Sequence, residues 1–285
     1  MWKSVLSLFT ETFKQWNAHK APKMGAALAY YAILSLAPLV ILSLSLMSLL
    51  VQRTTAQTEI VDQFSALVGR QGGEMVSTIL AGAASTKAGV WSAIVGFVVL
   101  LIGASGAFGE LQDSLNQIWE VKVTERSWMA MIKDRLLSFA MVFVIGFLLL
   151  VSLLLSAAIS AAAKFLQGYL PGNGAVWELG NAAVSIVIVT VLFALIFRIL
   201  PDTYIAWRDV WVGSALTAAL FTVGKFLIGL YLGKAAVASS YGAAGSLIII
   251  LLWTYYTSQI LFFGAEFTRV FAHRCGTRQG TPCTS

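Results

Sequence analysis

Long uncharged apolar segments alternate with shorter polar segments along this chain. From Gly242 to Ala265 no residue carries a charge, and as a helix at 1.5 Å per residue this run extends about 36 Å. That length exceeds the ~30 Å hydrocarbon core of a bilayer, so the run predicts a transmembrane helix. Five further apolar runs lie at about residues 25–51, 88–108, 136–163, 179–197 and 210–232, and the last of these contains one charged residue, Lys225. The pattern therefore predicts an all-α, polytopic membrane protein with six transmembrane helices.

The segment before the first run has a different pattern. Its apolar residues recur at helical spacing, at Trp2, Val5, Leu6, Phe9, Phe13 and Trp16. Charged residues occupy other positions, which predicts an amphipathic helix on the membrane surface rather than a cleaved signal peptide. We therefore divide the chain into an amphipathic interfacial helix (1–20), a six-span membrane domain (21–271) and a disordered cytoplasmic tail (272–285). Between the first two spans, residues 52–87 are predicted to form a polar loop with short helices divided at Gly72–Gly73.

Positive charges fall mostly on one side of the predicted spans. Six spans place both termini on the same side, and the opposite side carries only Arg53, Arg70, Lys87, Lys164 and Lys234. The cytoplasmic segments of membrane proteins are enriched in Lys and Arg. The charge distribution therefore predicts that both termini are cytoplasmic.

Composition narrows the function classes. Hydrophobic residues make up 58% of the chain and charged residues 11%, where soluble proteins have about a quarter charged. The net charge of +6 is explained by cytoplasmic Lys and Arg rather than by nucleic-acid binding. The sequence contains neither a Walker-type phosphate loop nor a His-Glu-x-x-His or Cys-x-x-Cys pattern. We therefore expect no enzyme, no cofactor and no metal site.

The last predicted span carries a polar stripe. Tyr255, Gln259 and Glu266 lie at positions i, i+4 and i+11, which a helix stacks on one face. Polar groups at membrane depth are costly unless they meet partners or water, so this face is expected to point into the protein. The predicted substrate-binding residues, which we call the cavity set, are Tyr30, Tyr31, Lys225, Tyr255 and Gln259.

Lys225 has two interpretations. Its ammonium group could reach the membrane interface along the four-carbon side chain, or it could pair inside a cavity with an anionic headgroup or a carboxylate. At the cytoplasmic ends of the spans we expect a polar network of Glu110, Asp113, Arg198, Asp202, Arg208, Glu266 and Arg269. An interfacial network that locks the helices is favoured here over a proton relay.

A proline and a set of glycines are candidate hinges. Pro38 removes one backbone hydrogen bond from the first span. Gly103, Gly106 and Gly109 recur every third residue at the end of the second span, a spacing that marks close helix packing or a break in the helix. The helix is predicted to continue past these glycines out of the membrane.

Four stretches together resemble the YihY/BrkB family of bacterial inner-membrane proteins. They are Ala26–Pro38, Gly106–Trp119, Leu200–Thr203 and Tyr241–Thr268. The resemblance implies a multi-pass protein of the bacterial inner membrane. The family was once labelled ribonuclease BN, a label generally regarded as mistaken, and members have been linked to serum resistance and to movement of lipids or other amphiphiles. The resemblance assigns no catalytic or binding residue.

The leading hypothesis is an inner-membrane protein that binds and translocates a lipid-like or small amphiphilic substrate. In that case the partners are membrane lipids, with a homo-oligomer or an envelope protein as further options, and no nucleic acid. The alternative is a non-transporting scaffold for envelope integrity, docking partners through residues 1–20 and 110–135. A membrane-bound enzyme that uses only carboxylates is the least favoured hypothesis.

Overall fold

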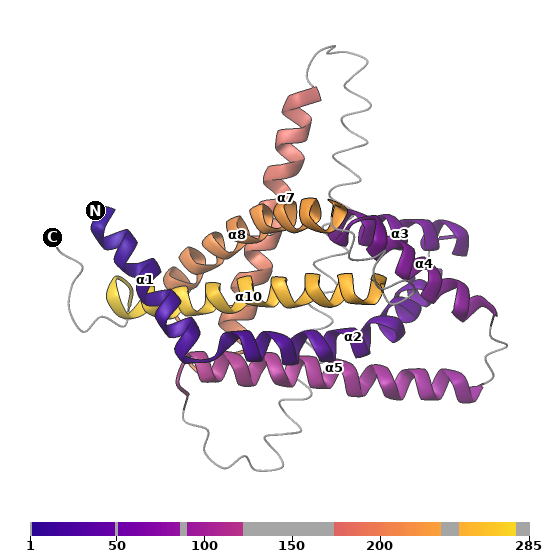
Figure 1. The fold of residues 1–285 in the computed structure, drawn as a ribbon, viewed down its shortest axis with the longest axis horizontal. Helices are drawn as coiled ribbons and strands as arrows, with labels where there is room; N and C mark the ends of the chain where they lie inside the picture. Colours follow the sequence, from indigo (N-terminus) through magenta and orange to yellow (C-terminus); the bar gives the residue numbers. More distant parts are fainter. Residues whose placement is uncertain (1, 49–50, 86–89, 122–173, 235–244, 278–285) are drawn as a thin grey trace. The chain divides into compact units, whose positions relative to one another are not determined.

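The computed structural model describes residues 2–48, 51–85, 90–121, 174–234 and 245–277 (Figure 1). All regular elements in these ranges are α-helices, which confirms the predicted all-α class. They are α1 (Trp2–Ala18), α2 (Ala21–Met47), α3 (Arg53–Val68), α4 (Arg70–Ser85), α5 (Val90–Ile118), α7 (Gly174–Ile199), α8 (Trp207–Lys234) and α10 (Gly245–Arg274).

Three helices in the described ranges are long and apolar enough to cross a membrane. These segments are Ala21–Ser45, Trp207–Ile228 and Gly245–Arg274, and α7 contains a shorter apolar segment, Ser185–Ile199. They correspond to the predicted first, fifth, sixth and fourth spans. The predicted second span begins α5, which continues without interruption to Ile118 as expected. The predicted third span, 136–163, lies outside the described residues.

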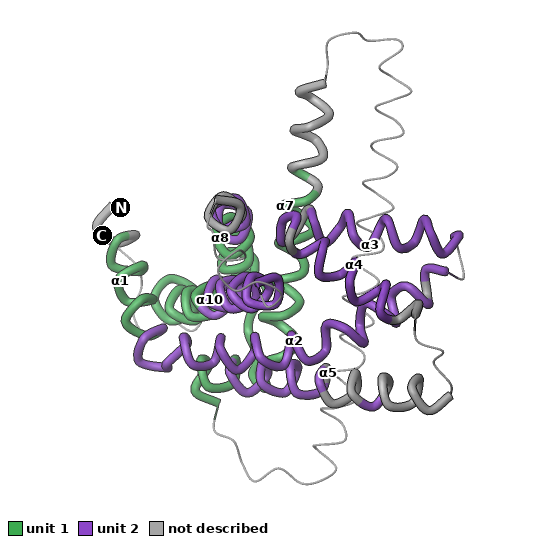
Figure 2. The backbone as a smooth tube through the Cα atoms, turned by 45° about the vertical axis from the view of Figure 1, so that its right-hand side comes forward, with its two compact units in different colours: residues 1–15, 115–220, 263–285 green, residues 16–114, 221–262 purple. Residues whose placement is uncertain are grey.

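The chain forms two compact units, shown in different colours in Figure 2. Unit 1 comprises residues 1–15, 115–220 and 263–285, and unit 2 comprises residues 16–114 and 221–262. Four helices, α1, α5, α8 and α10, contribute residues to both units.

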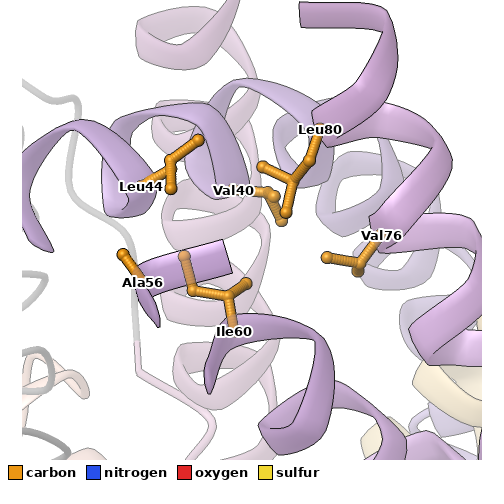
Figure 3. Close-up of a cluster of buried hydrophobic side chains, with 6 residues drawn as sticks. All are labelled: Val40, Leu44, Ala56, Ile60, Val76 and Leu80. Atoms are coloured by element: carbon orange, nitrogen blue, oxygen red, sulfur yellow. The ribbon is translucent and has the colours of Figure 1, made fainter. Parts of the chain in front are cut away.

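A core of unit 2 joins α2 to a hairpin of α3 and α4. Its buried side chains come in pairs from the three helices: Val40 and Leu44, Ala56 and Ile60, Val76 and Leu80 (Figure 3). A second cluster gathers Val68, at the end of α3, with Ile249 and Ile250 of α10. Ile33 and Leu36 of α2 and Ile228 of α8 pack against this second cluster. The hairpin is therefore anchored along much of its length to the apolar helices of unit 2.

The position of the break in this hairpin differs from the prediction. The chain reverses at Gly69, whose φ of 93° is a left-handed conformation that favours glycine. Gly72 and Gly73, where the break was expected, lie buried inside α4. A Cβ at Gly73 would come within 1.9 Å of the Ser65 hydroxyl oxygen, so this glycine lets α4 lie close against α3.

In unit 1, the first helix lies on the end of the last one. The Phe9 ring centroid is 6.4 Å from that of Phe263 and 5.5 Å from that of Phe267. On the same helix Thr12 is fully buried, and its hydroxyl donates a hydrogen bond to the carbonyl oxygen of Leu8. The apolar face predicted for residues 1–20 is therefore partly used for packing within unit 1.

Candidate functional site

The first two residues of the cavity set are neighbours on α2. The rings of Tyr30 and Tyr31 meet edge to face with centroids 5.5 Å apart. Tyr30 is 59% exposed, whereas Tyr31 is half-buried over Gly106 of α5. A Cβ at Gly106 would lie 2.4 Å from the nearest atom of the Tyr31 ring. Gly106 therefore provides the space that the Tyr31 ring occupies.

Gln259 occupies an unusual position on α10. Its amide lies over Gly25 of α2, where an added Cβ would sit 2.0 Å from the amide nitrogen. Both polar atoms of this amide are buried and have no hydrogen-bond partner among the residues that the structure describes. Leaving a buried donor or acceptor unsatisfied costs about 1–3 kcal/mol. Gln259 therefore presents unused hydrogen-bonding capacity in the interior of unit 2.

The other two residues of the cavity set differ in burial. Tyr255, one turn from Gln259 on the same helix, is half-buried, while Lys225 of α8 is exposed. Val223, Phe226 and Leu227, which flank Lys225, are exposed as well. An exposed lysine on an apolar surface fits the interpretation in which the ammonium group reaches the membrane interface. The cavity set thus ranges from the covered amide of Gln259 to the exposed side chains of Tyr30 and Lys225.

The hinge candidates lie within continuous helices, and two of them, Gly103 and Gly106, are contact points. Pro38 lies inside α2, and α5 runs unbroken through Gly103, Gly106 and Gly109. A Cβ at Gly103 would lie 3.0 Å from the backbone of Ser35, so this glycine permits close contact between α5 and α2. Gly109 has open space beside it. Of the two meanings of this glycine spacing, the structure shows close packing.

Asp202 of the predicted polar network pairs with a residue that the sequence did not suggest as its partner. The Asn116 amide donates to the Asp202 carboxylate at 2.7 Å, and the Asp202 backbone N–H donates to the Asn116 carbonyl oxygen at 2.8 Å. Asn116 is buried near the end of α5, and Asp202 lies in the segment between α7 and α8. The reciprocal pair therefore fixes this segment to α5 within unit 1.

Arg198, in the last turn of α7, contacts residues of the same segment. Its guanidinium lies 4.1 Å from the centroid of the Tyr204 ring and 5.8 Å from that of Trp207. The guanidinium also donates a hydrogen bond to the backbone carbonyl of Ile205. A cation over two aromatic faces is stabilised by the negative charge of the ring faces. Arg198 thus holds a structural position in the turn between α7 and α8.

The two network residues on α10 are connected to each other. Glu266 is fully buried, and its carboxylate lies 3.9 Å from the Arg269 guanidinium, which also forms an ion pair with Glu120. Asp209, another buried carboxylate, accepts hydrogen bonds from the Thr277 backbone N–H at 3.1 Å and hydroxyl at 2.6 Å. Glu120, Asp209 and Thr277 were absent from the predicted network.

The remaining network residues lie elsewhere. Arg208 is exposed at the start of α8, and Glu110 and Asp113 belong to unit 2 on α5. Glu110 lies beyond the predicted second span, and burial raises the pKa of its carboxyl group. The negative charge of Asp113 adds to this rise in pKa, and the neighbouring Ser114 hydroxyl opposes it.

The described residues offer no group of three or more His, Cys, Asp or Glu side chains placed to hold a metal ion. The polar contacts in unit 1 join the end of α5 to the segment between α7 and α8, and the start of α8 to the residues after α10. The choice between a structural network, which the sequence favoured, and a proton relay stays a prediction.

Comparison with known proteins identifies the relatives of this chain. A family model for "Virulence factor BrkB" matches residues 12–284. "Putative ribonuclease-like protein YfkH" of Bacillus subtilis (strain 168) is 23% identical over 273 residues, covering 94% of this chain and 96% of the relative. A "UPF0761 membrane protein" of Janthinobacterium sp. (strain Marseille) is 27% identical over 271 residues, covering 94% of this chain and 60% of the relative.

A second UPF0761 membrane protein, from Albidiferax ferrireducens, is 31% identical over 190 residues, covering 66% of this chain and 42% of the relative. The chain thus spans about 60% or less of the length of these UPF0761 relatives. No solved structure matches the chain. With the family model covering nearly its whole length and its apolar helices suited to a bilayer, the chain belongs to the BrkB family of membrane proteins.

Proposed function

We propose that this chain is a bacterial inner-membrane protein of six transmembrane helices that binds and translocates a lipid-like or small amphiphilic molecule. In this proposal residues 1–20 lie on the membrane surface, residues 21–271 form the membrane domain, and both termini are cytoplasmic. The apolar helices α2, α8 and α10 and the distribution of Lys and Arg support this arrangement.

The observation that carries the proposal is the unsatisfied amide of Gln259. Gln259 lies about 21 Å along α10 from Gly245. In the proposed membrane domain this position is within the hydrocarbon core, where no water is present to satisfy the buried amide. A buried amide without a partner is a costly feature unless it binds something. The polar part of an amphiphile would satisfy both the donor and the acceptor of this side chain.

The other residues of the cavity set supply complementary chemistry. Tyr30 and Tyr31 offer amphipathic rings that suit the boundary between a headgroup and an acyl chain. Lys225 offers a cation to an anionic headgroup from the exposed surface of α8. Pro38, with one backbone hydrogen bond fewer in α2, and the glycines at 103, 106 and 109 allow the helices to bend as the substrate passes.

The test is native mass spectrometry of the protein extracted gently from its own membrane. We expect wild type to retain a lipid or amphiphile, and Gln259→Leu and Lys225→Ala to retain less of it. Lys23→Ala, which removes an exposed cation at the start of α2, is the matched control and should retain as much as wild type. Equal retention by all four proteins would refute the role of the cavity set.

Transport needs a second measurement with the same variants. Reconstituted wild type is expected to accelerate exchange of a fluorescent phospholipid between the leaflets of liposomes, and Gln259→Leu should slow that exchange. If wild type binds lipid but does not accelerate its exchange between the leaflets, the protein binds lipid without translocating it, and that part of the proposal is refuted.

A second candidate function is a scaffold that holds a homo-oligomer or an envelope partner. It is favoured by two large apolar side chains of α1, Leu6 and Phe13, which are 58% and 59% exposed. Cross-linking from a photoreactive residue at position 13 distinguishes the two candidates. Cross-links to a protein would favour the scaffold, and cross-links to lipid would favour a surface-bound helix in the transport proposal.

A further inference from the structure

The hairpin of α3 and α4 packs along the second half of α2. Each helix has 16 residues, about 24 Å of length, and the single residue Gly69 reverses the chain between them. Near the end of α2, Leu44 and Val40 share a cluster with Ala56 and Ile60 of α3. The chain therefore turns after α2 and continues antiparallel to it.

The tip of the hairpin packs against the apolar segments of α2 and α10. Val68, next to Gly69, shares a cluster with Ile249 and Ile250, and Ile33 packs against this cluster. Ile33 is the central residue of the apolar segment Ala21–Ser45, about 18 Å from either end. Ile249 lies about 6 Å along α10 from Gly245. The contact with α2 thus places the tip about 18 Å inside one apolar segment, and the contact with α10 places it about 6 Å inside the other.

The exposed surface of the hairpin is polar at this depth. Arg70, the first residue of α4, forms an ion pair with Glu74 at 3.6 Å, and their side chains are 83% and 61% exposed. Further exposed polar side chains of the hairpin are Asp62, Gln63, Ser77 and Thr78. Charged and polar groups at membrane depth face water or protein rather than lipid chains. This face of the hairpin therefore requires a polar environment inside the membrane.

Two open, shallow hollows that share Val61 and Ser77 lie along this face, and together we call them the hairpin groove. Its lower part, near the tip, is lined by Ser65, Gly73, Thr78 and the Arg70–Glu74 pair. Its upper part is lined by Gln57, Thr58, Leu80 and Ala81, and Val61 and Ser77 line both parts. None of the cavity set lines the groove. The groove therefore combines hydroxyl groups, an amide and charges of both signs.

We propose that α3 and α4 form a re-entrant hairpin that enters the membrane from the outer side, and that the hairpin groove binds the headgroup of a zwitterionic phospholipid. The phosphate is held by Arg70, whose planar guanidinium suits phosphate oxygens, and the ammonium group by Glu74. A headgroup with both charges replaces the ion pair without leaving either side chain unpaired. This proposal rests on the proposed function, in which the protein binds a lipid, and it adds a second headgroup site for phosphatidylethanolamine-like lipids that is separate from the cavity set.

The first experiment tests the hairpin itself by its depth and water access. Single cysteines are introduced at Gln52, Gln63, Thr78 and Leu251 after Cys275 and Cys283 are replaced by serine. We expect a membrane-impermeant maleimide added outside to label Gln52→Cys before α3 and Thr78→Cys in the groove. Leu251→Cys, on the exposed apolar side of α10, should stay unlabelled.

Depth comes from a bimane fluorophore attached at positions 52 and 63. Phospholipids with a nitroxide midway along the acyl chain should quench Gln63→Cys-bimane at least about twofold more strongly than Gln52→Cys-bimane. Equal and weak quenching at both positions, or protection of Thr78→Cys from the maleimide in every lipid, would overturn the re-entrant hairpin.

The second experiment tests the headgroup with the same Thr78→Cys label. In vesicles with equal phosphatidylethanolamine and phosphatidylglycerol, labelling should be about threefold slower than in phosphatidylglycerol alone. Arg70→Gln should abolish this protection, and Arg70→Lys should keep most of it because a cation remains. Unchanged protection in Arg70→Gln, or none in the parent protein, would overturn the headgroup site.

The two proposals fail in different ways. If Gln259→Leu loses bound lipid while Arg70→Gln has no effect on labelling, the proposed function stands and the hairpin groove is not its headgroup site. If the wild-type protein neither retains lipid nor accelerates exchange, while phosphatidylethanolamine still protects Thr78→Cys, the proposed function fails and the groove remains a lipid site.

Discussion

Thr217 of α8 packs its side chain on Gly264 of α10, where an added Cβ would lie 1.9 Å from the threonine hydroxyl oxygen. The relationship is repeated in the opposite direction, because Thr268 of α10 covers Gly213 of α8 with a corresponding distance of 1.8 Å. Each threonine also donates a 2.7 Å hydrogen bond to a carbonyl of its own helix, Thr217 to Gly213 and Thr268 to Gly264. The two helices are thus joined in unit 1 by small residues with satisfied hydroxyls.

Gly264→Ala should destabilise the protein by about 1–3 kcal/mol, because its methyl group would overlap the Thr217 side chain. The measurement is unfolding in detergent followed by tryptophan fluorescence. Gly109→Ala, in open space on α5, is the control and should be neutral or slightly stabilising. Thr217→Ala should restore part of the stability to Gly264→Ala, and a lack of any rescue would contradict this contact.

Asn116→Ala should cost about 1–3 kcal/mol, because it leaves the Asp202 carboxylate and backbone N–H without these two bonds. A double-mutant cycle with Asp202→Ala isolates the side-chain term. We expect the double variant to be more stable than the sum of the single effects implies. Strict additivity would show that the hydrogen bond between the two side chains contributes nothing to the attachment of the segment between α7 and α8.

Glu110→Gln should raise the thermal stability of the protein at pH 7. Burial and Asp113 raise the pKa of Glu110 in the folded state, so the ionised carboxylate is disfavoured by folding. The stability linked to this group is fully present below its unfolded pKa of about 4.5 and is lost as the pH rises through the folded pKa. The difference in melting temperature between the two proteins should therefore shrink towards pH 4. A difference independent of pH would contradict this cause.

Gln259→Leu should separate stability from function. Removing a buried amide that has no partner in the described structure should leave unfolding unchanged or stabilise the protein by about 1–2 kcal/mol. The same variant is expected to lose bound lipid, so stability and binding should change in opposite directions. A destabilisation above about 2 kcal/mol would indicate that the amide has a structural partner instead.

Hydropathy was sufficient to predict helix within α2, α5, α7, α8 and α10, because a long apolar run in a membrane has few alternatives to a helix. The number of six transmembrane helices stays a prediction. Hydropathy did not predict the role of each glycine, because the sequence does not distinguish a glycine needed for positive φ from one needed for close packing. Gly69 is of the first kind and Gly73 of the second, and the predicted break was therefore displaced to Gly72–Gly73.

The polar contacts were the least accessible to sequence reasoning. Asn116 and Asp202 are 86 residues apart, and Asp209 and Thr277 are 68 apart, so neither pairing follows from helical spacing. Gln259 was predicted as an interior polar residue from the stripe on its helix. Its position over Gly25 depends on how α2 and α10 approach each other, which periodicity does not determine.

The aromatic rings near Arg198 would also limit movement of α8 along its own axis in a bilayer. Trp207 and Trp211, with ring centroids 6.3 Å apart, are half-exposed at the start of this helix, next to the exposed Tyr204. Tryptophan and tyrosine rings prefer the headgroup layer of a bilayer, so they favour a position of the start of α8 in that layer. Lys225 follows about 27 Å further along the helix, close to the opposite boundary of a ~30 Å core. With aromatic rings at one interface and an ammonium group at the other, displacement of α8 in either direction would move one of these groups out of its preferred layer. Groups at both ends would therefore fix the depth of α8 in the bilayer.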